Sequence, residues 1–260
     1  MKIIGSDYDG TLTHGGIDDV KRQAIADWRA AGNIFAIVSG RASYSLHLTQ
    51  EVDRIPFDYF IAYNGGIILN EKGEPLFERT CTTLSAKRLL KDLFYKWGFT
   101  YAHVFVDRHY VVKRDKADLK EGDVWFEDLD DFPYFYQFSI MQKPEKRTRW
   151  AVRKIRQKYG RHVTPLQNGF CIDIVPRGIN KAQGLRTLAK LLGVDKRDIV
   201  AVGDNINDMA MIKAFRSYAM ENGVDKLKRA ADELTPSVTA LIQRELASDR
   251  SDTPSINTKI

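Results

Sequence analysis

The stretch that decides the fold reads Lys2-Ile3-Ile4-Gly5-Ser6-Asp7-Tyr8-Asp9-Gly10-Thr11-Leu12-Thr13. A short apolar run that stops at Asp-x-Asp-Gly-Thr predicts a buried strand with two carboxylates at its end, because side chains i and i+2 of a strand share a face. Asp7 and Asp9 would repel each other unless a divalent cation lies between them, and hard oxygen ligands favour Mg²⁺, which also binds phosphate oxygens. The alternative interpretation is an ordinary turn, since Asp and Gly are common in turns after strands.

A second continuous apolar run, residues 33–38, leads into Ser39-Gly40. The segment between the two runs predicts a helix over residues 20–30. Continuous apolarity is typical of strands covered on both faces, and a helix between two such strands indicates a parallel β-α-β unit. We therefore expect an α/β fold with a doubly wound parallel sheet. A hydroxyl followed by glycine at a strand end can hold a phosphate oxygen, although this pair is also common in turns.

The pattern changes at about residue 79. Strand candidates such as 101–113 alternate apolar with charged residues, which predicts an antiparallel sheet covered on one face only. An α+β insert of about one hundred residues is large enough to fold on its own. The expected organisation is a core, an inserted domain and a polar, disordered tail. Their boundaries are 1–78 with 178–246 for the core, 79–177 for the insert and 247–260 for the tail.

Two later junctions carry further polar residues. Asn180 is a candidate N-cap for a helix that starts at Lys181, where the helix dipole disfavours a cation, so an anion is expected nearby. A simple surface lysine is the alternative. The strand candidate 198–202 then ends at Gly203-Asp204-Asn205-Ile206-Asn207-Asp208. Ligands of such sheets bind beyond the carboxyl ends of the strands, which is where each of these motifs lies. Asp208 could also serve only as an acid at a helix N-terminus.

These four junctions, in this order, resemble the four motifs of the haloacid dehalogenase-like phosphotransferases. The segment Tyr63-Asn64-Gly65-Gly66 resembles a stretch of the Cof-type branch, whose inserted cap is of type IIB, with a tight turn as the alternative. The resemblance covers about residues 1–246 and implies a Rossmann-like core with a cap. It also implies that Asp7 is the nucleophile, which forms an aspartyl-phosphate, and that Asp9 is the general acid/base.

The resemblance implies the other site residues as well. Mg²⁺ would be held by Asp7, the backbone carbonyl of Asp9 and Asp204, with Asp208 behind them as an orienting group. Phosphate would be bound by the backbone N–H groups of Tyr8 and Asp9. The other phosphate-binding residues that the resemblance implies are Ser39, Gly40, Lys181 and Asn207.

The function implied by the resemblance is Mg²⁺-dependent hydrolysis of small phosphorylated metabolites, above all sugar phosphates. A phosphosugar mutase would share the chemistry but would return the phosphate to the substrate. A non-catalytic phospholigand-binding protein is an alternative from another class, and the presence of both Asp7 and Asp9 argues against it.

Composition limits the partners and the compartment. The net charge of +6 could suggest nucleic acid, but the basic clusters at 147–161 and 226–229 have helical spacing and are interpreted as solvated helix faces. No apolar run approaches the ~20 residues of a membrane span, and no leader segment precedes the first motif. Cys81 and Cys171 form no metal-ligand pattern. We expect a cytoplasmic protein, a monomer or weak homo-oligomer, without nucleic-acid or membrane partners.

Overall fold

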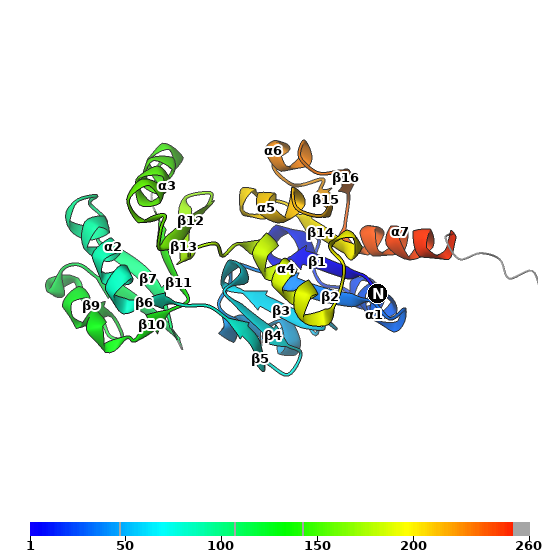
Figure 1. Cartoon of the computed structure of the whole chain (residues 1–260), viewed down its shortest axis with the longest axis horizontal. Helices are drawn as coiled ribbons and strands as arrows, with labels where there is room; N and C mark the ends of the chain where they lie inside the picture. Colours follow the sequence, from blue (N-terminus) through cyan, green and yellow to red (C-terminus); the bar gives the residue numbers. More distant parts are fainter. Residues whose placement is uncertain (47, 107, 142, 252–260) are drawn as a thin grey trace, which may run out of the picture.

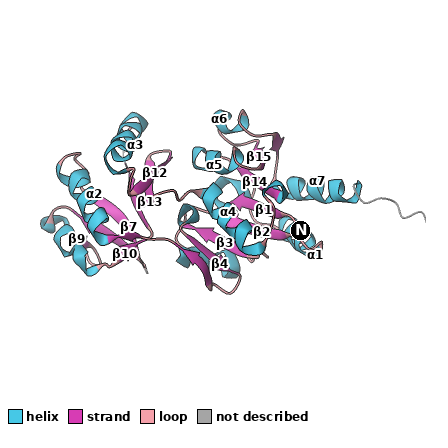
Figure 2. Ribbon diagram, viewed as in Figure 1, coloured by secondary structure: helices cyan, strands magenta, loops and turns pink. Residues whose placement is uncertain are grey.

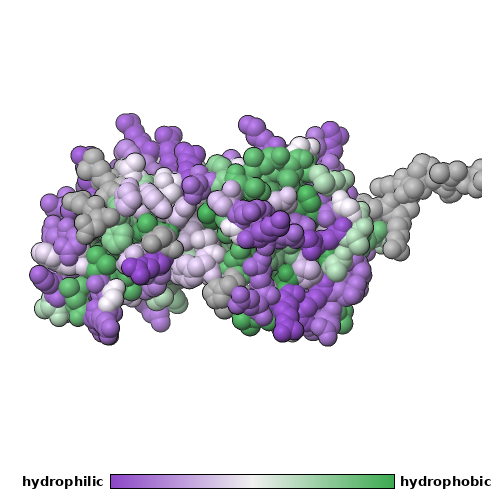
Figure 3. Space-filling view, turned by 90° about the horizontal axis from the view of Figure 1, so that it is seen from below, coloured by the Kyte–Doolittle hydropathy of each residue, from purple (hydrophilic) through white to green (hydrophobic). Residues whose placement is uncertain are grey.

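The computed structural model describes residues 1–46, 48–106, 108–141 and 143–251. The chain forms two lobes, a larger one around an eight-stranded sheet and a smaller one around a six-stranded sheet (Figures 1 and 2). Two segments of the chain connect the lobes. The first begins at residue 79 and the second follows residue 176. In the space-filling view the facing sides of the two lobes touch (Figure 3).

The large sheet has the order β16-β15-β14-β1-β2-β3-β4-β5. Its strands from β16 to β3 are parallel, and the hairpin of β4 and β5 adds an antiparallel edge. The predicted doubly wound parallel sheet is thereby confirmed. The strand bounds in chain order are β1 Ile3–Asp7, β2 Ile34–Val38, β3 Tyr59–Ala62, β4 Ile67–Asn70, β5 Pro75–Glu78, β14 Ile199–Gly203, β15 Arg216–Met220 and β16 Glu233–Thr235.

Helices cover both faces of this sheet, which explains why β1 and β14 are buried along their whole length. Trp28 of α1 and Leu241 of α7 pack on one face, and Leu185 of α4 packs on the other together with residues of α5 and α6. The helices on the first face are α1 (Asp19–Ala30) and α7 (Val238–Ser251). Those on the second face are α4 (Lys181–Leu192), α5 (Met209–Ile212) and α6 (Asp225–Lys228).

Gly5 allows α4 to lie close to β1. A Cβ atom placed on Gly5 would come within 2.5 Å of Cδ2 of Leu185, so a larger residue there would push α4 off the sheet. The helix starts as predicted, because the Asn180 side chain accepts a hydrogen bond from the backbone N–H of Gln183 at 3.0 Å. This packing places Lys181, in the first turn of α4, beside the carboxyl end of β1.

The smaller lobe has an antiparallel sheet in the order β12-β13-β11-β7-β8-β9, in which only β8 and β9 run parallel. Ala102 and Val104 of β7 are buried in the core that this sheet forms with α2 and α3, whereas Tyr101, His103 and Phe105 alternate with them on the open face. The strand bounds are β7 Tyr101–Phe105, β8 His109–Lys113, β9 Val124–Trp125, β11 Gln137–Met141, β12 Val163–Asn168 and β13 Cys171–Pro176. The helices are α2 (Thr83–Tyr95) and α3 (Glu145–Tyr159), and a small ladder joins β6 (Cys81–Thr82) to β10 (Tyr134–Phe135).

The C-terminal helix differs from the expectation. α7 continues to Ser251, so the tail expected from residue 247 was wrong for its first five residues, and residues 252–260 lie outside the described part of the chain. The physical reason is that neither glycine nor proline stands between Leu246 and Pro254, so nothing in the sequence ends the helix. Within the described ranges, no helix combines the length and the apolar character that crossing a membrane requires.

Candidate active site

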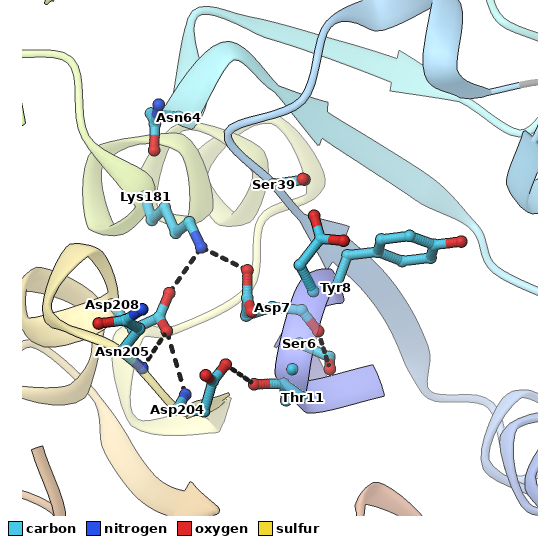
Figure 4. Close-up of polar contacts among 12 residues, drawn as sticks. Ser6, Asp7, Tyr8, Thr11, Ser39, Asn64, Lys181, Asp204, Asn205 and Asp208 are labelled. Carbon is cyan, nitrogen blue, oxygen red and sulfur yellow. Dashed lines mark hydrogen bonds and ion pairs between the residues drawn. The ribbon is translucent and has the colours of Figure 1, made fainter. Parts of the chain in front are cut away.

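Asp7 is the last residue of β1 and Asp9 follows two residues later, and their side chains contact different partners. After Asp7 the chain forms a tight turn over Tyr8–Leu12, in which Gly10 has a φ of 79°. Asp7 is 5% exposed and contacts Lys181, as Figure 4 shows. The carboxylate of Asp9 is 57% exposed and pairs with Arg41. The two carboxylates expected at the strand end are therefore present, one buried and one at the surface of the site.

Lys181 links the third and fourth motifs to Asp7. Its Nζ lies 2.5 Å from Oδ1 of Asp7 and 2.6 Å from Oδ1 of Asp208, and its side chain is fully buried (Figure 4). Burial alone would lower the pKa of Lys181, but the carboxylates of Asp208 and Asp7 reverse this and raise its pKa above the ordinary value. Lys181 is thus a charged, buried residue of the site, and the surface alternative is excluded.

The turn after β14 orients two further carboxylates. Backbone N–H groups of Asp204 and Asn205 donate to Oδ2 of Asp208 at 3.1 and 3.0 Å. Because Oδ1 of Asp208 accepts from Lys181, both of its oxygens are engaged, and this residue fixes the turn and the lysine. Asp204 receives a hydrogen bond from the Thr11 hydroxyl at 2.7 Å, which orients its carboxylate at the end of β14 (Figure 4).

The carboxylate cluster fits a divalent cation. One oxygen each of Asp7, Asp204 and Asp208 lie within 4.8 Å of one another. Three carboxylates there face a single ammonium group, and burial together with the charge of Asp208 raises the pKa of Asp7 well above its ordinary value. Burial also raises the pKa of Asp204. A hard divalent cation such as Mg²⁺ would neutralise this excess negative charge. The Asp9 side chain is not part of the cluster, so only its backbone could take part.

The second motif supplies a compact turn next to Asp7. Ser39 is 1% exposed, and its hydroxyl accepts a hydrogen bond from the backbone N–H of Arg41 at 3.1 Å. Gly40 packs closely against two side chains, because a Cβ atom there would lie 3.2 Å from Nδ2 of Asn64 and 3.4 Å from Oδ2 of Asp173. The backbone of the turn is therefore pressed against polar side chains from both lobes.

Tyr8 and Asn207 differ in what they can offer a ligand. The hydroxyl of Tyr8 donates to the carboxylate of Asp53 and its ring is buried, so only the backbone of Tyr8 remains for the expected phosphate contact. Oδ1 of Asn207 is buried and has no hydrogen-bond partner among the described residues. A buried polar atom without a partner is costly, which makes Asn207 a candidate ligand contact.

A cavity of about 430 Å³ lies between the two lobes and brings most of the expected residues together. Asp7, Asp9, Ser39, Gly40 and Asn207 line it from the large lobe. Lys181, Asp204 and Asp208 do not line this cavity themselves, but Lys181 contacts Asp7, and Asp204 and Asp208 belong to the same carboxylate cluster as Asp7. The small lobe contributes Phe105, Gln137, Ser139, Asn168, Cys171 and Asp173.

Several site residues were not predicted as such from the sequence. Arg41 adjoins the predicted Ser39-Gly40 pair, and Asn64 was considered only as part of a turn or as a substrate contact. In fact Asn64 has a left-handed backbone, with a φ of 56°, and donates from Nδ2 to Gln137 and Asp173, both at 3.1 Å. Asp173 had one signal, a lone carboxylate in the apolar strand Cys-Ile-Asp-Ile-Val.

Comparison with known proteins covers nearly the whole chain. The family model described as haloacid dehalogenase-like hydrolase matches residues 4–240. The 5-amino-6-(5-phospho-D-ribitylamino)uracil phosphatase YwtE of Bacillus subtilis (strain 168) is 28% identical, over 91% of this chain and 93% of YwtE. The structure of SMU.1108c from Streptococcus mutans UA159 has a TM-score of 0.80 at 20% identity, over 95% of this chain and 99% of that one. The HAD subclass IIB sugar phosphatase BT4131 has a TM-score of 0.75 at 19% identity, over 94% and 99%.

Proposed function

The chain belongs to the haloacid dehalogenase-like hydrolase family and is a phosphatase of that family, and from this premise we propose that it hydrolyses small phosphorylated metabolites with Mg²⁺ as cofactor. The observation that carries the proposal is the position of Asp7, which ends β1 at the cavity, is paired with Lys181, and shares a cation-sized cluster with Asp204. Few other functions need a buried nucleophile, a buried ammonium group and a cation site at one strand end.

In the proposed reaction Asp7 attacks the phosphorus atom in line and forms an aspartyl-phosphate. Asp7, Asp204 and the backbone carbonyl of Asp9 would hold Mg²⁺, which when bound supplies positive charge next to the phosphate. Lys181 neutralises the nucleophile and the phosphate, while Asp208 keeps the lysine in place through the 2.6 Å contact. Removing Asp208 would leave Lys181 with one carboxylate partner and a less defined position.

Asp9 is proposed as the general acid that protonates the leaving oxygen and then as the base that activates water. Its carboxylate lines the cavity and is solvent-exposed, so it can exchange protons with bulk water. The phosphate oxygens would be bound by the hydroxyl of Ser39, the Asn207 side chain and backbone N–H groups of Tyr8, Asp9 and Gly40. The Ser39 hydroxyl and the backbone N–H groups are held by the local turns before the substrate arrives, and such preorganised donors stabilise the charge of the transition state.

The smaller lobe, residues 79–177, is proposed to act as a cap that selects the alcohol part of the substrate. It supplies one wall of the cavity, opposite the nucleophile. YwtE is named for a phosphorylated ribitylamino compound and BT4131 for sugar phosphates. These names support sugar phosphates and related phosphate esters as the substrate class of this chain.

The proposal is tested by phosphate release from p-nitrophenyl phosphate and from a panel of phosphorylated metabolites, with and without Mg²⁺. We expect Mg²⁺-dependent turnover with wild-type protein and none above background with Asp7→Asn of the same fold by circular dichroism. Turnover by folded Asp7→Asn, or wild-type turnover that survives a chelator, would contradict it. Transfer of the phosphate to a second sugar position instead of water would identify a mutase.

A further inference from the structure

Asp173 is a buried carboxylate of the small lobe that faces the active-site cavity. It lies on β13, is 8% exposed, and lines the same cavity as Asp7. Its Oδ1 accepts a hydrogen bond from the Ser139 hydroxyl at 2.6 Å, and its Oδ2 accepts one from the Asn64 amide at 3.1 Å. Oδ2 also lies close to Gly40, next to the proposed phosphate-binding turn. The carboxylate is thus held in a defined orientation beside the phosphate site.

The partners of Asp173 differ from those of Asp92, the other carboxylate of this lobe that is buried among the residues whose burial is described. Asp92 contacts the ammonium groups of Lys158 and Lys96, as a structural carboxylate should. The hydrogen-bond donors that the described residues offer to Asp173 are neutral: Ser139, Asn64 and, at 3.7 Å, the thiol of Cys171. A buried carboxylate without a salt bridge is costly for folding, which favours a role in binding.

The neighbouring groups leave acceptor capacity on Asp173. A carboxylate can accept about four hydrogen bonds, and Ser139 and Asn64 supply two. Gln137 is occupied, because its Nε2 donates to Ser139 and to the carbonyl of Gly40, and its Oε1 accepts from Asn64. Asp173 is therefore a preoriented acceptor at the cavity wall, and Phe105, the register partner of Gln137 on β7, adds an apolar side chain to the same cavity.

We propose that Asp173, oriented by Ser139 and Asn64, accepts a hydrogen bond from a hydroxyl group of the leaving alcohol and so selects phosphorylated polyols and sugars. This inference rests on the proposed function, since the phosphate must be held at Asp7 for the alcohol to reach the cap. An acceptor next to the phosphate site favours leaving groups that carry hydroxyl donors. It disfavours leaving groups with a second phosphate or a carboxylate, which Asp173 would repel.

The test compares two esters of the same carbon number, ribitol 5-phosphate and n-pentyl phosphate, of which only the first carries hydroxyl donors. Wild-type protein should prefer ribitol 5-phosphate in kcat/KM. In Asp173→Asn this preference should fall by about 10- to 100-fold, the range for a lost hydrogen bond to a charged group. Ser139→Ala removes only the hydroxyl that orients Asp173 and should reduce the preference by a smaller factor. It provides the test if Asp173→Asn does not fold.

Asp92→Asn is the matched control, because it makes the same change in a buried carboxylate of the same lobe away from the cavity. It should leave the preference unchanged. If Asp173→Asn and Ser139→Ala slow both esters equally, the network is structural and the inference is overturned. The inference is also overturned, with the phosphatase assignment intact, if wild-type protein hydrolyses p-nitrophenyl phosphate but shows no preference for ribitol 5-phosphate. Failure to hydrolyse any ester would overturn the proposed function and the inference with it.

Discussion

Arg41 holds the carboxylate of Asp9 through two hydrogen bonds, from Nε to Oδ2 at 2.8 Å and from Nη2 to Oδ1 at 2.6 Å. Its guanidinium also lies over the ring of Tyr8, 4.7 Å from the ring centroid, and the Tyr8 hydroxyl is bound by Asp53. The planar guanidinium of arginine can donate two hydrogen bonds to one carboxylate and stack on an aromatic ring at the same time, which the ammonium group of lysine cannot do. The structure thus orients the proposed acid/base through a residue that is itself fixed on two sides.

We expect Arg41→Lys to reduce kcat for sugar phosphates by about 10-fold, because the charge is kept while the orientation of Asp9 is lost, and general acid–base help is worth about 10² to 10⁴ in rate. Arg41→Ala should cost more. Steady-state kinetics on purified variants measures both. Arg29→Lys is the control, since Arg29 pairs with Asp58 and Glu71 outside the cavity. A wild-type kcat in Arg41→Lys would show that the pair has no part in catalysis.

The features that local sequence determines were predicted. The continuous apolar runs of β1, β2 and β14 indicated a parallel sheet, and the Asn180 cap followed from residue type and position. The family resemblance drawn from four motifs is confirmed by the family match over residues 4–240. These features depend on periodicity and on short spacings, which a single sequence displays directly.

The features that depend on long-range pairing were not predicted. Ser139 meets Asp173 only because β11 and β13 pair in a particular register, and nothing in either strand alone specifies that register. Asn64 reaches both lobes because Tyr63 and Asn64 adopt positive φ angles, and their residue types do not require this conformation. The pairing of Arg41 with Asp9 likewise joins residues 32 positions apart.

The carboxylate cluster predicts a specific response to Mg²⁺. In the metal-free protein, Asp7, Asp204 and Asp208 repel one another, and Lys181 is the cation that the described residues place in contact with them. Asp7→Asn removes one of the three charges, so we expect its metal-free Tm to rise by about 2–4 °C for each kcal/mol of relieved repulsion. Its turnover should fall by several powers of ten, because the nucleophile is lost.

Thermal unfolding with a chelator and then with Mg²⁺ tests this prediction. Mg²⁺ should raise the Tm of wild-type protein more than that of Asp7→Asn, because binding to the folded state stabilises it by mass action and the variant has lost a ligand. NaCl at equal ionic strength controls for general ionic effects. A wild-type Tm that does not respond to Mg²⁺ would contradict the assignment of the cluster as a cation site.

Asp92 predicts how the stability of the smaller lobe depends on pH. Burial would raise its pKa, but hydrogen bonds from Lys158, Lys96 and Tyr159 outweigh it and lower the pKa to about 2. Because this value lies below the ordinary 3.8, the ionised carboxylate stabilises the folded state above pH 4, and the stabilisation is lost as the pH falls from about 4 to about 2. We expect Asp92→Asn to lower the free energy of unfolding by on the order of 1 kcal/mol at pH 6, because the solvent exposure of the partner lysines weakens the ion pairs. Denaturant unfolding of both proteins at pH 6 and pH 3 measures the difference, which should shrink at pH 3; a constant difference would argue against an ionised Asp92.

Asp9→Asn should separate the two steps of the proposed reaction. A p-nitrophenolate leaving group departs with little protonation, so the variant should still transfer phosphate from p-nitrophenyl phosphate to Asp7. Hydrolysis of the aspartyl-phosphate needs a base to activate water, and that step should slow by about 10² to 10⁴. The phosphorylated protein should therefore accumulate, and mass spectrometry of the acid-quenched peptide that contains Asp7 would detect the added phosphate. Asp7→Asn treated in the same way is the control and should stay unmodified. If Asp9→Asn accumulates no phosphate and loses aryl-phosphate and sugar-phosphate cleavage to the same extent, Asp9 is not the acid/base of this site.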